Sequence, residues 1–178
     1  MFKLKVDEEI DLMLVHESFC SKYVDLAKEN YEHLASWLSW PPHVKTRDDF
    51  LKFVQKCLHD YADGKSIMCG IFYHGELVGN ICYSNIDWNL KKVEIGYWLA
   101  SSHQGKGIVT RACQKLIRVA FDDMGMDKVQ MSVAENNFPS RSVCERLRMT
   151  VEGIVTNAEY LNDRIVSHAI YGLHKGET

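Results

Sequence analysis

The sequence predicts a single domain of the mixed α+β class. Segments with apolar residues at helical spacing are interspersed with short extended runs, in the order β-α-α-β-β-β-α-β-α-β-β. The regular strand-helix alternation of a doubly wound parallel sheet is missing. The 178 residues suit one domain, and no repeat, low-complexity tract or linker divides residues 1–178. We therefore expect a central twisted mixed sheet of about seven strands, flanked by about four helices.

The first third of the chain predicts one strand and two helices. Residues 10–15 (I-D-L-M-L-V) form an apolar extended run. Residues 19–38 carry apolar side chains at a helical period, and the double proline after Trp40 cannot continue a helix. Thr46 is a favourable N-cap for a second helix, which Gly64 ends.

The remaining elements follow from the same patterns. Strand-like runs occupy residues 66–73, 77–84 and 93–99, and the H-G-E sequence between the first two predicts a hairpin. We then expect a helix over residues 107–123, a strand over 128–134 and a short helix over 137–147. Two closing strands, residues 150–160 and 165–173, are joined by the turn L-N-D at 161–163.

Bulk composition excludes several classes of partner. The formal net charge of −3 gives no reason to expect nucleic acid or an anionic membrane. The N-terminus has no signal-peptide pattern and no run reaches membrane-spanning length, so we expect a soluble cytoplasmic protein. The six cysteines and eight histidines are scattered without C-x-x-C or H-x-x-x-H spacing. This pattern predicts reduced thiols and no metal site.

Two glycines at one strand-to-helix junction indicate a site. Residues 101–111 read S-S-H-Q-G-K-G-I-V-T-R, directly after the strand-like V-E-I-G-Y-W-L-A. A P-loop is excluded because His59 stands where its first glycine is needed before G-K-S, and a dinucleotide fingerprint would need a third glycine within a βαβ unit. A plain structural turn remains an alternative. Otherwise, the free amides at such a helix start favour an anion.

The same residues carry a resemblance to a known family. Gln104 to Val109, Q-G-K-G-I-V, is similar to the Q/R-x-x-G-x-G/A signature of the GNAT acetyltransferase superfamily, except that Val109 replaces a small residue. Residues 135–149 resemble the family's N-x-x-S-x-x-V-x-E-x-L-G-F block, with Arg148 at the glycine position. The segments A-E-Y-L-N-D and W-L-S-W-P look like the branch of ribosomal-protein-serine N-terminal acetyltransferases. The resemblance spans roughly residues 10–173 and implies the GNAT fold.

In this family acetyl-CoA is the cosubstrate, and an amine attacks its thioester directly. The resemblance implies that the junction amides hold the pyrophosphate, that the backbone of the preceding strand contacts the pantetheine arm and the developing oxyanion, and that an asparagine binds the arm from the other side. The cofactor-binding residues expected on this basis are Trp98, Leu99, Gln104, Gly105, Lys106, Gly107, Ile108, Val109, Thr110 and Asn137. A helix N-cap role for Asn137 is compatible with this assignment.

Two residues are the expected catalytic groups. Glu159 matches the glutamate that serves this branch as base, and Glu94 is the runner-up. Many family members use a tyrosine as the general acid, but Cys144 stands at that position here. Ser140 matches the serine that is the proposed general acid of this branch. The plainer alternatives are a solvated strand-end charge for Glu159 and a first-turn helix serine for Ser140. The expected acceptor-side residues are Trp40, Glu94, Tyr160 and Asn162, although Trp40 could equally belong to the core.

The acceptor stays open at this point. An α-amino group loses its proton more easily than a lysine, which favours a protein N-terminus, in this branch that of a ribosomal protein. A small-molecule amine such as a polyamine or aminoglycoside is the first alternative, and a non-catalytic acyl-CoA sensor is the second. Several acidic side chains in the acceptor cleft would favour a polycation, whereas a groove open at one end would favour a peptide. The branch resemblance also suggests a homodimer.

Overall fold

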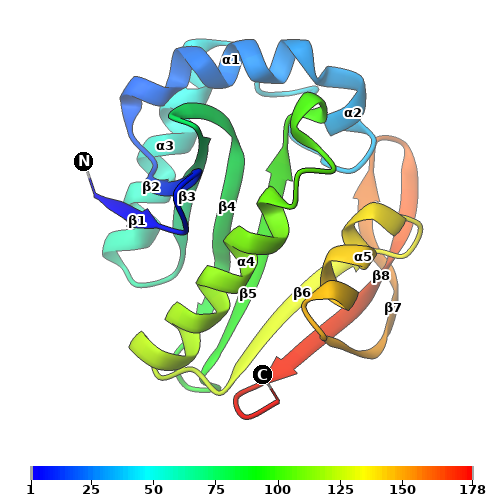
Figure 1. Cartoon of the computed structure of the whole chain (residues 1–178). Helices are drawn as coiled ribbons and strands as arrows, with labels where there is room; N and C mark the ends of the chain where they lie inside the picture. Colours follow the sequence, from blue (N-terminus) through cyan, green and yellow to red (C-terminus); the bar gives the residue numbers. More distant parts are fainter. Residues whose placement is uncertain (1, 178) are drawn as a thin grey trace.

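The computed structural model describes residues 2–177, which contain one eight-stranded sheet in the order β1-β2-β3-β4-β5-β6-β8-β7 (Figure 1). Its strands are β1 (Lys3–Lys5), β2 (Ile10–Leu14), β3 (Ile67–Tyr73), β4 (Glu76–Asp87), β5 (Lys92–Leu99), β6 (Lys128–Ala134), β7 (Thr150–Leu161) and β8 (Arg164–His174). Neighbouring strands are antiparallel except for the pair β5 and β6. The expected mixed α+β class is confirmed.

Helices cover both faces of this sheet. They are α1 (Cys20–Glu29), α2 (Tyr31–Ala35), α3 (Arg47–Ala62), α4 (Ile108–Arg118) and α5 (Phe138–Arg146). One buried apolar cluster joins α1 and α3 to one face, and a larger cluster joins α4 and α5 to the other. No helix within residues 2–177 is long and apolar enough to cross a membrane.

The structure adds a strand and a helix to the expected elements. Strand β1 was not predicted because it has only three residues, two of them exposed lysines, and its pairing with β2 is not visible in the local pattern. The helix expected over residues 19–38 is broken at Asn30. The side-chain amide of Asn30 donates to the carbonyl of Leu26 (2.9 Å), which also accepts the backbone N–H of Asn30 (3.1 Å), so the last carbonyl of this turn has two donors at the end of α1.

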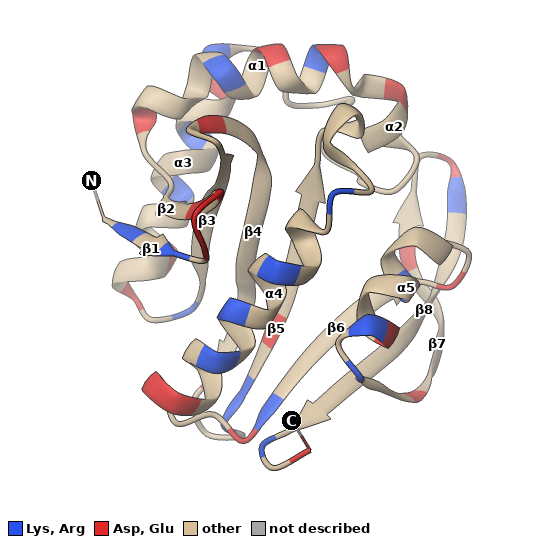
Figure 2. Ribbon diagram, viewed as in Figure 1, with Lys and Arg blue, Asp and Glu red and all other residues tan. Residues whose placement is uncertain are grey.

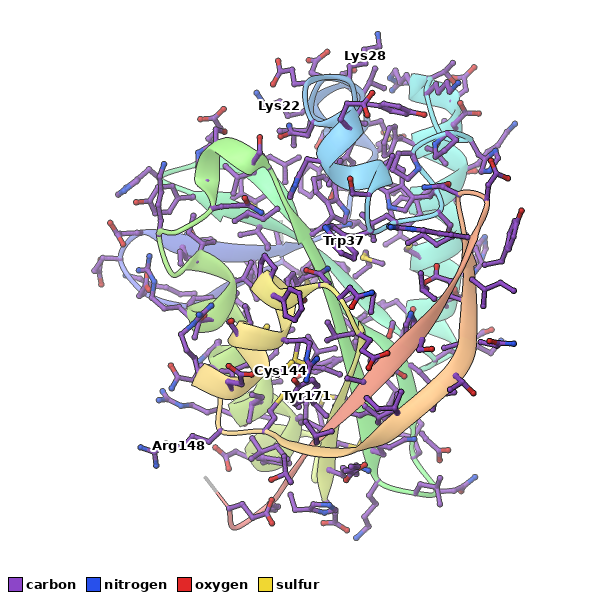
Figure 3. All side chains as sticks on the ribbon, turned by 90° about the vertical axis from the view of Figure 1, so that its right-hand side faces the viewer. Lys22, Lys28, Trp37, Cys144, Arg148 and Tyr171 are labelled. Atoms are coloured by element: carbon purple, nitrogen blue, oxygen red, sulfur yellow. The ribbon has the colours of Figure 1, made fainter. Side chains whose placement is uncertain are left out.

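Helix and hairpin ends agree with the residues expected to form them. Thr46 caps α3 through a capping box with Asp49. His74 and Gly75 have φ of 49° and 81°, which is typical of a two-residue hairpin turn. Arg148, at the position where the family has glycine, has a left-handed φ of 58° and points away from the protein in Figure 3. This conformation costs a non-glycine residue about 1 kcal/mol.

The main feature of the sheet is the separation of β5 from β6. The two strands pair only over Lys92–Glu94 and Lys128–Gln130. Beyond these residues β5 continues to pair with β4, and β6 with β8, so each strand keeps a partner on its outer side. The second half of β5 therefore lies apart from β6, and helices α4 and α5 begin at the open end (Figure 1).

Candidate active site

A cavity of about 720 Å³ lies between the separated strands. Most of the residues predicted for the site line it: Trp40, Trp98, Leu99, Gln104, Gly105, Gly107, Ile108, Val109, Thr110, Asn137, Ser140 and Glu159. They come from the loop before α3, from β5, from the glycine junction, from α5 and from β7. Residues far apart in the sequence thus meet around one space, which has the size of a small-molecule site.

Four predicted residues lie outside this cavity. The Lys106 ammonium lies over the Tyr73 ring, 5.5 Å from its centroid. Glu94 belongs to the paired part of β5, opposite Gln130. Tyr160 and Asn162 line a neighbouring groove of about 940 Å³ that shares Trp37 and Ser39 with the cavity but does not reach the space between β5 and β6.

The glycine junction forms an exposed helix start. Gly105 and Gly107 have φ of 75° and 70°, a backbone conformation that favours glycine. Gly107 is the N-cap of α4 and supplies no side-chain hydrogen bond. The first amides of α4, from Ile108 onwards, therefore have no acceptor within the helix, and the helix dipole adds positive potential there. This arrangement suits an anionic group such as a phosphate.

Two arginine side chains lie near this helix start. Arg111 is held by Asp7 (2.8 Å) and Glu9 (2.7 Å), so its charge is already balanced. The hydrogen bond from Arg111 holds the pKa of Glu9 below its ordinary value. Arg146, which the sequence patterns did not single out, lines the cavity and donates from Nε to Thr110 Oγ1 (3.3 Å). Figure 2 shows the acidic β1–β2 turn and the basic residues along α4.

A buried asparagine fixes the loop that leads into the junction. Asn30 Oδ1 accepts hydrogen bonds from the backbone N–H (2.8 Å) and the hydroxyl (2.9 Å) of Ser101. Its amide group is bound to the end of α1, as described above. Because Asn30 is only 6% exposed, this link is shielded from water. The break between α1 and α2 thus fixes the loop before the glycine junction.

Ser140 has a phenolic partner that sequence reasoning missed. The hydroxyl of Tyr97, on β5, lies 2.6 Å from Ser140 Oγ, and both side chains line the cavity. Burial raises the pKa of Tyr97, so the phenol keeps its proton at neutral pH. Asn137 caps α5 by accepting from the Ser140 N–H (3.2 Å). The only signal for Tyr97 was the period of two along β5, which does not reveal the facing helix.

Consecutive residues of β5 alternate in the directions of their side chains and backbone groups. The indole of Trp98 lies on the other face, 5.9 Å from the Trp40 ring. Ala100 donates to the Val78 carbonyl (2.8 Å). Trp98, two residues before Ala100 on β5, is paired with Asn80. Because antiparallel hydrogen bonds alternate along a strand, the backbone groups of Trp98 point to β4 and those of Leu99 point to the cavity.

Glu159 lines the cavity beside another residue that was not predicted. Its Oε2 is 3.2 Å from Nε2 of His168 on β8, and both side chains line the cavity. The side chain of Glu159 is about one-third exposed, so water can reach it. His168 was missed because its proximity depends on the register of β7 with β8, which the sequence does not reveal.

Comparison with known proteins identifies the family. The model of the acetyltransferase (GNAT) domain family matches residues 21–150. The chain belongs to the GNAT acetyltransferase family. The GNAT fold expected from the sequence is therefore confirmed, and the chain is an acetyl-CoA-dependent N-acetyltransferase.

Among its GNAT relatives, the ribosomal-protein-serine acetyltransferase of Escherichia coli (strain K12) is 34% identical over 160 residues, which cover 90% of this chain and 89% of that protein. The structure of RimL, a ribosomal L7/L12 alpha-N-protein acetyltransferase, in complex with coenzyme A superimposes with a TM-score of 0.94 at 26% identity, covering 99% and 100% of the two chains. The microcin C7 self-immunity acetyltransferase MccE, in complex with acetyl-CoA and AMP, gives 0.92 at 29% identity, covering 97% and 96%.

The thiol at the position of the usual GNAT tyrosine is buried in the core. Cys144, labelled in Figure 3, has no exposed surface, and its sulfur lies 3.9 Å from that of Met131. Burial raises the pKa of Cys144 to about 12, so the thiol is inert at neutral pH. Tyr97 instead brings a phenol into the cavity from β5.

Proposed function

We propose that the enzyme transfers the acetyl group of acetyl-CoA directly to the α-amino group of a protein N-terminus, that of a ribosomal protein. The observation that carries this proposal is the cavity between β5 and β6, which has an anion-binding helix start on one side and Glu159 on another. Relatives named for ribosomal-protein acetylation support the acceptor. Such an acceptor is made in the cytoplasm, where we propose that the enzyme acts.

The residues around the cavity suit acetyl-CoA. The uncapped amides of α4 would bind the pyrophosphate, with Arg146 contributing charge beside them. The backbone groups of Leu99 that face the cavity would bind the pantetheine arm, which takes the place of a strand between β5 and β6. Asn137 lines the opposite wall and would contact the arm there. Holding the thioester in this way makes the attack of the amine effectively unimolecular.

Proton transfer falls to two separate groups. Glu159 would remove the proton of the ammonium group, directly or through one water molecule. As the amine attacks, the thioester oxygen gains negative charge, and a backbone N–H of β5 that faces the cavity would donate to it. Ser140 would then protonate the departing thiolate, with the neutral Tyr97 phenol as its hydrogen-bond partner. No acyl-enzyme is needed.

The cavity favours a peptide over a polycation. Glu159 is the one carboxylate among its lining residues within the described part of the chain, whereas a polyamine would need several. The groove beyond Trp37 and Ser39 leads outward past the hairpin of β7 and β8 and would hold the residues that follow an acetylated N-terminus. In Figure 3 Trp37 lies beside this hairpin, and the Arg164 guanidinium lies 5.5 Å from its ring centroid. Asn162 donates to the carbonyl of Leu38 (3.2 Å), which fixes one groove wall.

The test combines acetyl-CoA titration with a thiol-release assay against N-terminal peptides and polyamines. Glu159→Gln should lower kcat by about 10²- to 10⁴-fold while acetyl-CoA affinity stays nearly unchanged. Glu94→Gln is the matched control, because Glu94 lies outside the cavity. If the control lost activity and Glu159→Gln did not, Glu94 would be the base. Thiol release with a polyamine and with no peptide would refute the proposed acceptor in favour of a small-molecule amine.

A further inference from the structure

The sheet geometry brings His168 beside the proposed base. His168 is paired with Val155, and Glu159 with Val166, so four steps on β7 match two steps on β8. The extra residues form a bulge in which Asn157 has a φ of 52°. The bulge places Glu159 opposite Val166, which is two residues from His168 on β8 and on the same face of the sheet. A regular ladder would have placed Asn157 opposite Val166 and kept the carboxylate away from the imidazole.

The contact has one chemically sensible form. Nε2 of His168 lies 3.2 Å from Glu159 Oε2, within ion-pair distance, and because a carboxylate can only accept, this contact is attractive when Nε2 carries the proton. This contact restricts the directions of the imidazole and of the carboxylate. It leaves Oε1 of Glu159 free for the acceptor amine. Within residues 2–177, no other side chain lies within hydrogen-bond or ion-pair distance of this carboxylate.

The surroundings of His168 make it a suitable support. Its side chain is only 18% exposed, whereas the Glu159 side chain is 34% exposed. His168 is also paired through its backbone with Ala134 of β6, so both neighbouring strands hold it. An imidazole on a paired strand has few conformations, and it can transfer this rigidity to a flexible glutamate through this polar contact.

We propose that His168 is a positioning residue for Glu159, which holds the base in the direction from which the amine approaches. This inference rests on the proposed role of Glu159 in acetyl transfer. A base must lie within hydrogen-bond reach of the proton it removes, and a displacement of about 1 Å can cost on the order of 10²-fold in rate. His168 would therefore affect kcat through Glu159, without touching acetyl-CoA.

Two substitutions of similar size separate positioning from packing. His168→Met removes the donor, and His168→Gln keeps an N–H donor at a comparable reach. We expect His168→Met to lower kcat about 10- to 100-fold, with the acetyl-CoA Kd changed less than about twofold. His168→Gln should stay within about threefold of the wild type. In the Glu159→Gln background, His168→Met should have little further effect, since the base is already absent.

The readouts are kcat and KM for the peptide, acetyl-CoA titration and the thermal midpoint of each variant. Wild-type kcat in His168→Met, with acetyl transfer otherwise intact, would overturn the inference and leave the proposed function standing. Equal losses of kcat in His168→Met and His168→Gln would likewise overturn the inference in favour of packing. A full additional loss of kcat from His168→Met in the Glu159→Gln background would do the same. If the wild type transferred no acetyl group, the proposed function and this inference would fall together.

Discussion

Gly79 is the position where an added methyl group would act most directly on the cavity. A Cβ built at Gly79 would lie 2.3 Å from the carbonyl oxygen of Trp98 and 3.0 Å from the Cα of Leu99. Both atoms belong to the backbone of β5, so no side-chain rotation can relieve the overlap. To restore an ordinary contact of 3.4 Å, β5 would have to move about 1 Å away from β4, which is toward the cavity.

Gly79→Ala should therefore reduce both stability and cofactor affinity. Overpacking in a core costs roughly 1–3 kcal/mol, and a clash between two paired strands belongs at about 3 kcal/mol. For a chain of this length that corresponds to a fall of about 6–12 °C in Tm. Because Leu99 lines the cavity, we also expect acetyl-CoA binding to weaken about tenfold, or roughly 1.4 kcal/mol.

The assay is thermal unfolding together with acetyl-CoA titration. The matched control is Gly153→Ala on β7, where an added Cβ would meet no atom within 4 Å and φ is not positive. Its Tm should change by no more than about 2 °C, since a compatible Gly-to-Ala change is worth a few tenths of a kcal/mol. A Gly79→Ala protein with the Tm and the affinity of this control would refute the reasoning.

Three further predictions concern the site and its supports. Tyr97→Phe should lower kcat about 10-fold with little change in acetyl-CoA Kd, because Ser140 loses its hydrogen-bond partner at 2.6 Å. An unchanged kcat would show that the phenol takes no part in proton transfer. Gly105→Asp should abolish acetyl-CoA binding in titration, through the left-handed φ of 75° and repulsion of the pyrophosphate, and retained affinity would mean that the glycines form only a turn. Glu9→Gln should lower Tm at pH 7. Because Arg111 lowers the pKa of Glu9, the stabilisation is present above the ordinary glutamate value of about 4.3 and is lost as pH falls through the lowered value. A Tm difference that persists unchanged at pH 3 would contradict it.

What the sequence revealed about the fold depends on whether the signal was local. Thr46 with Asp49, and Gly107 before an apolar helix, are start signals that act within a few residues, and both helices begin there. Asn30 breaks a predicted helix because its side chain bonds both to Leu26 and to Ser101, a residue 71 positions away. No local pattern could have indicated that second contact.

The same distinction applies to the site. Asn137, Ser140 and Glu159 were expected from the family resemblance, and all three line one cavity. Tyr97 and His168 were missed because each depends on pairing across the sheet or between the sheet and a helix. Arg146 belongs to the same group, since its contact with Thr110 joins two helices.

The three-residue ladder between β5 and β6 also makes the lifetime of the folded enzyme depend on its substrate. Without acetyl-CoA the cavity-facing amides beyond Glu94 and Gln130 have no strand partner, so they should exchange hydrogen with water without any opening of the sheet. Acetyl-CoA at 100 times its Kd would stabilise the folded state by about 2.7 kcal/mol. The cellular supply of acetyl-CoA would then set the resistance of this protein to unfolding and proteolysis as well as its rate of turnover.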